Sequence, residues 1–113
     1  MRHKRGDVVI TLFPFADGPV AKRRPAVIIA GPWQIRETIA VCWIAMVTTS
    51  VLKGWPGDMD IVDLKAAGLP IPSIIRSLKI ACIDVGIIDK KAGHLDARAL
   101  KSLMTEIEKH LVE

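Results

Sequence analysis

The chain has 113 residues, a length typical of one domain, so we expect a single domain over residues 1–113. Half of the residues are hydrophobic and a quarter are charged, which supports a packed core and excludes a disordered chain. The net charge is +4 with a pI near 9.3, which favours an anionic partner only weakly.

Several classes of protein are disfavoured. The longest apolar run, residues 39–47, has nine residues, far fewer than the ~20 that span a bilayer. The amino-terminal apolar run is interrupted by Pro14 and lacks a cleavage site, so no signal peptide is expected. Cys42 and Cys82 have no metal-ligand spacing and are expected to be reduced core thiols. We therefore expect a cytoplasmic protein without a membrane partner, metal or cofactor.

The first half of the chain predicts strands. β-branched and apolar residues fill positions 8–12, 25–30 and about 38–48, whereas Gly, Pro and charges over 16–24 indicate a loop. Gly31-Pro32 is expected to end the second strand.

The second half is less regular. It predicts a turn at 53–58, a short strand at 59–62, and a turn or single helical turn at 63–70. Residues 73–88 indicate two short strands separated by an irregularity near Arg76 to Leu78.

An amphipathic helix is predicted over residues 96–111, with Asp96 as its N-cap. Its apolar face is expected to hold five residues at helical spacing: Leu100, Leu103, Met104, Ile107 and Leu111. Short strands followed by one terminal helix favour a mainly β fold, a small half-open barrel with a C-terminal helix.

A run of cations, Lys22, Arg23 and Arg24, enters the second strand directly before Pro25. Pro25 restrains the backbone of Arg24, and a guanidinium suits phosphate recognition. Taken alone, however, such a run is more often a solvated surface beside a core strand.

Hydroxyl groups close the third strand at Thr48, Thr49 and Ser50. They suit contacts with phosphate or a ribose 2′-OH, although turn-forming hydroxyls at a strand end explain them equally well.

Further polar and aromatic residues could extend a phosphate-binding rim. Ser73, Arg76 and Lys79 add a hydroxyl and two cations. Phe15, Trp33 and Trp55 could stack bases or belong to the core, and Lys53 lies in a turn. No histidine lies beside the Arg24 and Thr48 segments in sequence, and no nucleophile elbow, P-loop or zinc-protease motif is present.

In order and spacing, these segments resemble the PemK/MazF (Kid) family of toxin–antitoxin ribonucleases. The resemblance rests on "RGDVVITLFPFADGPVAKRRPAVIIAG", "IAMVTTS", "MDIVDLKAAGLPIPSIIRSLKIACID" and "GHLDARALKSLMTEIEKHL", and covers about residues 5 to 111. It implies an SH3-like barrel related to CcdB, and a homodimer. It also implies metal-independent cleavage of single-stranded mRNA, a cognate antitoxin, and DNA binding through the antitoxin complex.

The resemblance also assigns site residues. Arg24, Thr48 and Arg76 match the family's catalytic positions. The expected RNA-contacting residues are Phe15, Lys22, Arg23, Thr49, Ser50, Lys53, Trp55, Ser73 and Lys79.

One position departs from the PemK branch. Leu78 replaces an acidic residue two positions after the arginine, and leucine cannot transfer a proton. Three alternatives follow: Asp84 or His94 takes that role, the protein relies on Arg24 and Thr48 alone, or its activity is reduced. Two other functions stay open, a gyrase poison of the CcdB kind and a weakly active copy that retains RNA binding.

Overall fold

Six strands and two α-helices make up the part of the chain that a computed structural model describes, residues 2–13 and 22–112. The strands are β1 (Asp7–Leu12), β2 (Arg23–Arg36), β3 (Ile39–Thr49), β4 (Asp58–Asp60), β5 (Ser73–Asp84) and β6 (Ile88–His94). The helices are α1 (Leu64–Ala67) and α2 (Ala97–Val112), and single 3-10 turns occupy Ser50–Leu52 and Val85–Ile87.

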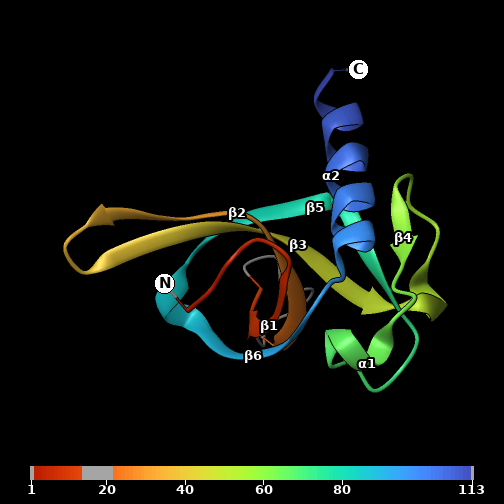
Figure 1. Cartoon of the computed structure of the whole chain (residues 1–113), viewed down its shortest axis with the longest axis horizontal. Helices are drawn as coiled ribbons and strands as arrows, with labels where there is room; N and C mark the ends of the chain where they lie inside the picture. Colours follow the sequence, from red (N-terminus) through yellow and green to blue (C-terminus); the bar gives the residue numbers. More distant parts are fainter. Residues whose placement is uncertain (1, 14–21, 113) are drawn as a thin grey trace.

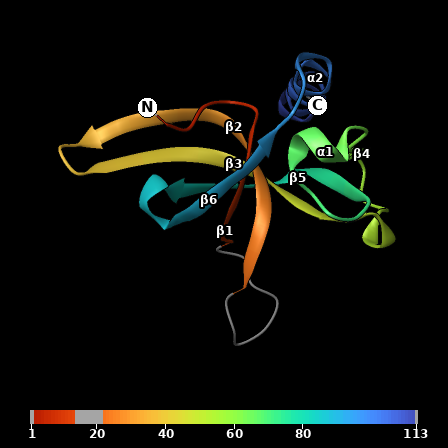
Figure 2. The ribbon, with the colours of Figure 1, turned by 60° about the horizontal axis from the view of Figure 1, so that its bottom comes forward.

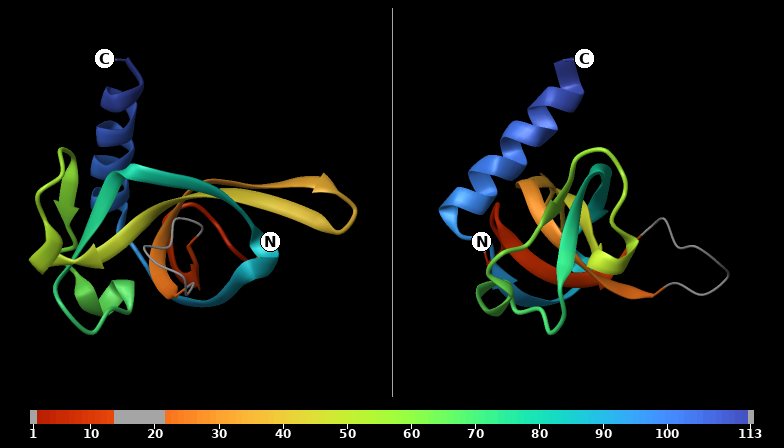
Figure 3. Two further views of the ribbon diagram at one scale, coloured as in Figure 1. Left: turned by 180° about the vertical axis from the view of Figure 1, so that it is seen from behind. Right: turned by 90° about the vertical axis from the view of Figure 1, so that its right-hand side faces the viewer.

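The strands form one antiparallel sheet in the order β4-β5-β3-β2-β1-β6. The sheet curls but does not close, because β4 and β6 remain at its two edges. The predicted mainly β, half-open barrel with a C-terminal helix is therefore confirmed. The hairpin of β2 and β3 projects from one side of the body, whereas β4 and α1 lie on the other (Figure 1). Figures 2 and 3 show the same arrangement from other sides.

Two buried clusters lie on opposite faces of the sheet. Alternation along each strand sends successive side chains to opposite faces. Helix α2 covers the first cluster, which includes Val27, Val47 and Ile75 from the sheet and Leu103 and Ile107 from the helix. The sheet curls around the second cluster, which contains Val9, Phe13, Ala26, Ile28, Cys42, Ile44, Met46, Ala81 and Ile83.

Helix α2 begins where the sequence predicts. The Ala99 backbone N–H donates to Asp96 Oδ1 over 2.8 Å, so Asp96 is the N-cap. The predicted apolar face is correct through Ile107 but wrong for Leu111, which is 78% exposed because the helix extends past the sheet. Neither described helix has the length and apolar content that a bilayer crossing requires.

Gly31-Pro32 does not end the second strand, contrary to the prediction. β2 continues to Arg36, and its pairing with β3 passes from Ala30 to Trp33 with a shift in register. Proline can be accommodated at such an irregularity because no ladder hydrogen bond is required of it there.

β5 is one strand rather than two, although its irregularity lies where the sequence indicates. Met46 of β3 pairs with Arg76 and the adjacent Ala45 pairs with Ile80, so residues 77–79 form a bulge. β6 is not predicted from the sequence, because its polar residues lack apolar alternation. Pairing with β1 nevertheless holds it in the sheet.

Candidate functional site

The three predicted catalytic residues share one face of the sheet. Met46 of β3 lies opposite Ala26 of β2 and Arg76 of β5. Arg24 is two residues from Ala26, and Thr48 is two residues from Met46. Side chains two residues apart in a strand point to the same face. The register therefore aligns Arg24, Thr48 and Arg76 across three neighbouring strands.

A cavity of about 460 Å³ lies where β2 begins and β3 ends. Six predicted site residues line it: Lys22, Arg23, Arg24, Thr48, Thr49 and Ser73. Ile10, Pro25, Val47, Gly68, Leu69, Pro70 and Ile71 complete the lining. The turn between α1 and β5 thus forms part of the cavity wall. Segments more than 40 residues apart in sequence meet here because antiparallel pairing brings these strand ends together.

The turn between α1 and β5 requires glycine at position 68. Gly68 has φ +73° and ends α1, and its N–H donates to the carbonyl of Lys65. A Cβ atom there would lie 2.0 Å from the Ala92 carbonyl oxygen of β6, so only glycine fits. This close packing holds the wall of the cavity against the sheet.

Arg24 is half-buried and has no ion-pair or hydrogen-bond partner among the described residues. Its neighbour Arg23 differs, since Arg23 Nε lies 3.7 Å from Asp89 Oδ2 in an exposed ion pair. A guanidinium without a counter-charge is available to an anionic ligand.

The hydroxyls beside Arg24 differ in how they are used. Thr48 is 8% exposed, and its hydroxyl has no hydrogen-bond partner within 2–13 and 22–112. Thr49 Oγ1 accepts weakly from the Val51 N–H at 3.4 Å, and Ser73 Oγ donates to the Ile71 carbonyl at 2.8 Å. Thr48 is therefore the hydroxyl that is most available to a ligand.

Arg76 has a different environment. Its Nε and Nη2 atoms donate to the two carboxylate oxygens of Asp58 at 3.1 and 3.0 Å, and Nη2 also donates to the Leu52 carbonyl at 2.7 Å. The side chains of Arg76 and Asp58 are only 7% and 1% exposed. Arg76 does not line the cavity, and most of its donors are engaged within the protein.

Asp58 is absent from the residues that the sequence predicts for the site. Burial alone would raise the pKa of Asp58, but hydrogen bonds from Arg76 and from the backbone N–H groups of Gly54 and Trp55 outweigh it and lower that pKa. One signal could have revealed this residue: an arginine inside a β-branched strand requires a buried acceptor, and Asp58 closes a Gly-rich turn nearby.

Four of the remaining predicted RNA contacts lie outside the cavity. Lys53 Nζ pairs with Asp60 Oδ2 at 2.7 Å, and Ser50 begins the 3-10 turn after β3. Trp55 and Lys79 lie beside Arg76. The guanidinium carbon of Arg76 is 4.3 Å from the Trp55 ring centroid, and Nζ of Lys79 is 5.9 Å from it. Phe15 falls outside the described residues.

Residues 4–111 match the family model of PemK-like, MazF-like toxins of type II toxin–antitoxin systems. This protein belongs to that family. Its toxins act as ribonucleases in type II toxin–antitoxin systems. No protein with a curated function matches the chain significantly.

Solved structures share the fold of this MazF-like chain. The Mycobacterium tuberculosis toxin MazF-mt6 is 22% identical, with a TM-score of 0.67 over 93% of this chain and 95% of its own. MazF from Deinococcus radiodurans is 16% identical, with a TM-score of 0.71 over 98% and 97%. An endoribonuclease in complex with its cognate antitoxin, from a mycobacterial species, is 14% identical, with a TM-score of 0.69 over 95% and 92%.

Neither candidate replacement for the missing acid of this MazF-like toxin lines the cavity. Asp84 ends β5, where its Oδ1 accepts from the Gly86 N–H at 2.7 Å. His94 ends β6 opposite Asp7. Leu78 lies in the β5 bulge, 44% exposed.

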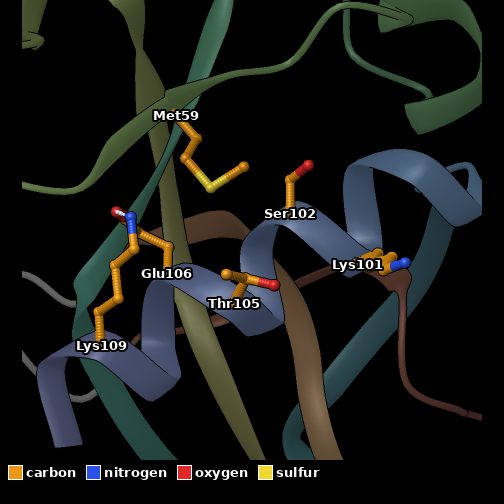
Figure 4. A pocket seen from close by; sticks show the side chains of 6 residues that line it. All are labelled: Met59, Lys101, Ser102, Thr105, Glu106 and Lys109. Carbon is orange, nitrogen blue, oxygen red and sulfur yellow. Dashed lines mark ion pairs between the residues drawn. The ribbon is translucent and has the colours of Figure 1, made fainter. Parts of the chain in front are cut away.

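A second hollow, of about 420 Å³, separates β4 from α2 (Figure 4). It is lined by Met59 and by five helix residues, Lys101, Ser102, Thr105, Glu106 and Lys109, of which Lys109 and Glu106 form an ion pair at 3.7 Å. None of the predicted site residues lies there. Within residues 2–13 and 22–112, no three His, Cys, Asp or Glu side chains gather as metal ligands would.

Proposed function

We propose that this protein is a sequence-specific, metal-independent endoribonuclease that cleaves single-stranded mRNA, and that the cavity beside Arg24 is its active site. The observation that carries the proposal is Arg24, which is half-buried, has no counter-charge among the described residues and lines a cavity together with Thr48, its neighbour on the same face of the sheet. Membership of a ribonuclease toxin family supports the choice of RNA as the anionic ligand.

The proposed reaction is a transesterification within the RNA. The 2′-oxygen attacks the adjacent phosphorus and loses its proton, the bond to the 5′-oxygen breaks, and that oxygen gains a proton. The products are a 2′,3′-cyclic phosphate and a free 5′-hydroxyl. Negative charge develops on the phosphoryl oxygens, so a fixed guanidinium at that position lowers the barrier by stabilising the transition state more than the ground state.

Four of the cavity residues then have a proposed role. Arg24 stabilises the phosphoryl charge and donates toward the leaving oxygen. Thr48 orients the 2′-OH or the phosphate. Lys22 and Arg23 attract the RNA backbone through charge. The described lining contains no carboxylate or imidazole, and arginine stays protonated at neutral pH and so cannot accept a proton. We therefore assign removal of the 2′-OH proton to no side chain.

In the cell, the proposed enzyme is a cytoplasmic homodimer inhibited by a cognate antitoxin. The family assignment supports this, as does the fold shared with an endoribonuclease that was solved together with its antitoxin.

The test is cleavage of a long single-stranded RNA by the purified protein, with the new 5′ ends mapped. We expect cuts at a short recurring sequence that persist in EDTA, and 2′,3′-cyclic phosphate termini. Replacing the ribose 5′ of the cut by deoxyribose should abolish that cut. Loss of cleavage in EDTA with recovery in magnesium would reject the mechanism. Growth inhibition without RNA cleavage would favour the gyrase-poison alternative.

A further inference from the structure

A further hollow, of about 500 Å³, lies where the turn before β1, the end of β6 and the start of α2 meet. Figure 2 shows β6 leading from the side of β1 to α2. Two lysines, an arginine and a histidine line this hollow: Lys4, Lys91, Arg5 and His94. We call it the Lys4 hollow. None of these four residues takes part in the reaction proposed above.

The turn that carries Lys4 and Arg5 is fixed by its own hydrogen bonds. The Asp7 N–H donates to the Lys4 carbonyl at 3.1 Å, and the Lys4 N–H donates to Asp7 Oδ2 at 3.0 Å. Gly6 has φ +94°, a value that favours glycine at the third position of such a turn. The two basic side chains therefore extend from a backbone of defined shape.

The same turn is joined to the sheet and to the helix. The Gly6 N–H donates to the Ile28 carbonyl of β2 at 2.8 Å, and the Gly6 carbonyl accepts from the Leu95 N–H, just after β6, at 2.9 Å. A Cβ atom at residue 6 would lie 3.1 Å from the Leu100 side chain of α2. The fold therefore sets the position of the Lys4 hollow before any ligand binds.

One carboxylate lines the Lys4 hollow, and its charge is already compensated. Asp7 is completely buried, and Lys91 Nζ lies 3.3 Å from its Oδ1 in an ion pair. Lys4 and Arg5 are exposed and have no acidic partner among the described residues. Two uncompensated cations therefore remain, beside a Lys91 side chain that is itself 43% exposed. This arrangement favours an anionic ligand.

β1 places the Lys4 hollow within reach of the cavity beside Arg24. Asp7, at the start of β1, pairs with His94, whereas Thr11, near its end, pairs with Arg24. From Asp7 to Thr11 the strand extends about 13 Å. Phosphates in one strand of a stacked nucleic acid are about 3.4 Å apart along the axis, so no more than about four nucleotides separate the two sites.

Exposed lysines lie between the two sites. Lys90 and Lys91 of β6 pair with the middle of β1, at Ile10 and Val9. β6 is an edge strand of the sheet, so no other described strand covers its outer side. The acid that precedes these lysines, Asp89, already pairs with Arg23. A row of cations thus leads along β6 from the cavity to the Lys4 hollow.

We propose that the Lys4 hollow is a second RNA-binding site, which holds the phosphodiester backbone of the substrate a few nucleotides from the cut. Lys4 and Arg5 contact phosphate oxygens, and Lys90 and Lys91 attract the strand between the two sites. Such contacts carry no sequence information, so the hollow raises the affinity for long RNA whatever its flanking sequence. The proposal rests on the proposed function, which identifies RNA as the anion.

The test measures how affinity depends on strand length. Two single strands carry deoxyribose throughout and cannot be cleaved, one of about six nucleotides and one of about fourteen. We expect the wild type to bind the long strand at least about tenfold more tightly than the short one, and the double variant Lys4→Ala, Arg5→Ala to lose most of that advantage. For the long strand, the slope of log Kd against log salt should fall by about 1.4, or about 0.7 for each lost phosphate contact.

The matched control is the double variant Arg36→Ala, Lys65→Ala. It removes one arginine and one lysine from exposed positions outside both the cavity and the Lys4 hollow, so its net charge equals that of the first variant. Its Kd for the long strand should change by less than about twofold. If the two double variants lost affinity equally, the effect would come from net charge and the proposal would be wrong.

A second measurement locates the bound strand. The ring protons of His94, assigned with the variant His94→Gln, should shift in NMR spectra when the long strand is added. Polyglutamate of similar charge mimics an acidic protein segment. If polyglutamate shifted these protons and the long strand did not, the hollow would bind protein and the proposal would be wrong.

Failure of the hollow and failure of the ribonuclease are distinguishable. A wild-type protein that binds the long strand through Lys4 and Arg5 but cuts no RNA would overturn the ribonuclease and leave the nucleic-acid site standing. Cleavage of RNA by a protein whose affinity for the long strand is unchanged in Lys4→Ala, Arg5→Ala would overturn the second site alone.

Discussion

Arg24 and Arg76 lie on the same face of one sheet but in opposite electrostatic environments. Arg76 is 6% exposed and held by both oxygens of a buried carboxylate, whereas Arg24 is half-buried, lines a cavity and pairs with no described acid. A buried charge with its partner maintains structure, and a charge without one is available to a ligand. We therefore propose that the same residue type stabilises the fold at position 76 and takes part in the reaction at position 24.

The largest effect is expected at Arg24. Arg24→Ala should slow RNA cleavage by about 10³-fold, the upper range for removing one oriented electrostatic group, with the free energy of unfolding changed by less than ~0.5 kcal/mol. The measurements are single-turnover cleavage and urea unfolding. Arg23→Ala is the matched neighbour and should weaken binding only modestly. Near-normal cleavage by Arg24→Ala would show that Arg24 has no catalytic role and so does not differ in function from Arg76.

Arg76 should behave in the opposite way in the same unfolding assay. Arg76→Ala leaves the Asp58 carboxylate buried without its partner, which costs roughly 3–5 kcal/mol. Asp58→Ala should lower the free energy of unfolding by a similar amount. The double variant should lower it by less than the sum of the two single variants, because the ion pair is lost only once. If Arg76→Ala were as stable as the wild type, the ion pair would not be structural.

Substitutions at Thr48 test whether RNA cleavage requires the hydroxyl of this residue. Thr48→Ala should slow cleavage by about 10²-fold, while Thr48→Ser should retain most of the rate because it keeps the hydroxyl. Rates at saturating RNA separate an orienting role from a binding one. Equal rates for all three proteins would make Thr48 a packing residue.

The ionisation of Asp58 gives the Arg76 region a pH signature. Its pKa is lowered in the folded protein, so its contribution to stability is complete above the unfolded value near 3.9 and is lost as the pH falls through the folded value. The stability difference between the wild type and Asp58→Asn should therefore narrow below about pH 4, as followed by urea unfolding. If the stability difference between the wild type and Asp58→Asn stayed constant down to pH 2.5, the lowered pKa of Asp58 would be contradicted.

The smallest effect is expected for the reactivity of the two cysteines, one of which is buried and the other exposed. Burial, reinforced by the nearby Cys82 thiol, raises the pKa of Cys42 to about 11, whereas Cys82 is exposed. The thiolate is the reactive form, so iodoacetamide at pH 8 should modify Cys82 more than tenfold faster than Cys42. Peptide mass spectrometry gives both rates, and equal rates would show that Cys42 becomes accessible.

The sequence predicts the elements whose signals are local. The apolar runs of β1 and β3 and the spacing and cap of α2 were sufficient to place them within one or two residues. β6 was not predictable, because its "IDKKAGH" sequence gains strand structure only from pairing with β1. The continuation of β2 past Pro32 likewise depends on β3.

The candidate site also has residues that the sequence marks locally and contacts that arise only from strand pairing. Short motifs marked Arg24 and Thr48 as candidates, the resemblance to the PemK/MazF family assigned them to the site, and both line the cavity because the ends of their strands converge. The environment of Arg76 could not be found, since its partner Asp58 is 18 residues away and meets it only through the pairing of β4 with β5. The sequence thus predicted several of the cations that line the cavity, but not the partners that each cation contacts.

The position of β1 has a consequence for the newly made chain. β1 is hydrogen-bonded to β2 on one side and to β6 on the other, and α2 closes the first core cluster with Leu103 and Ile107. Such contacts between the two ends of a chain form late, because the intervening segment must first be brought together. Residues 7–112 must therefore nearly all be present before β1 is paired on both sides and the first core cluster is closed.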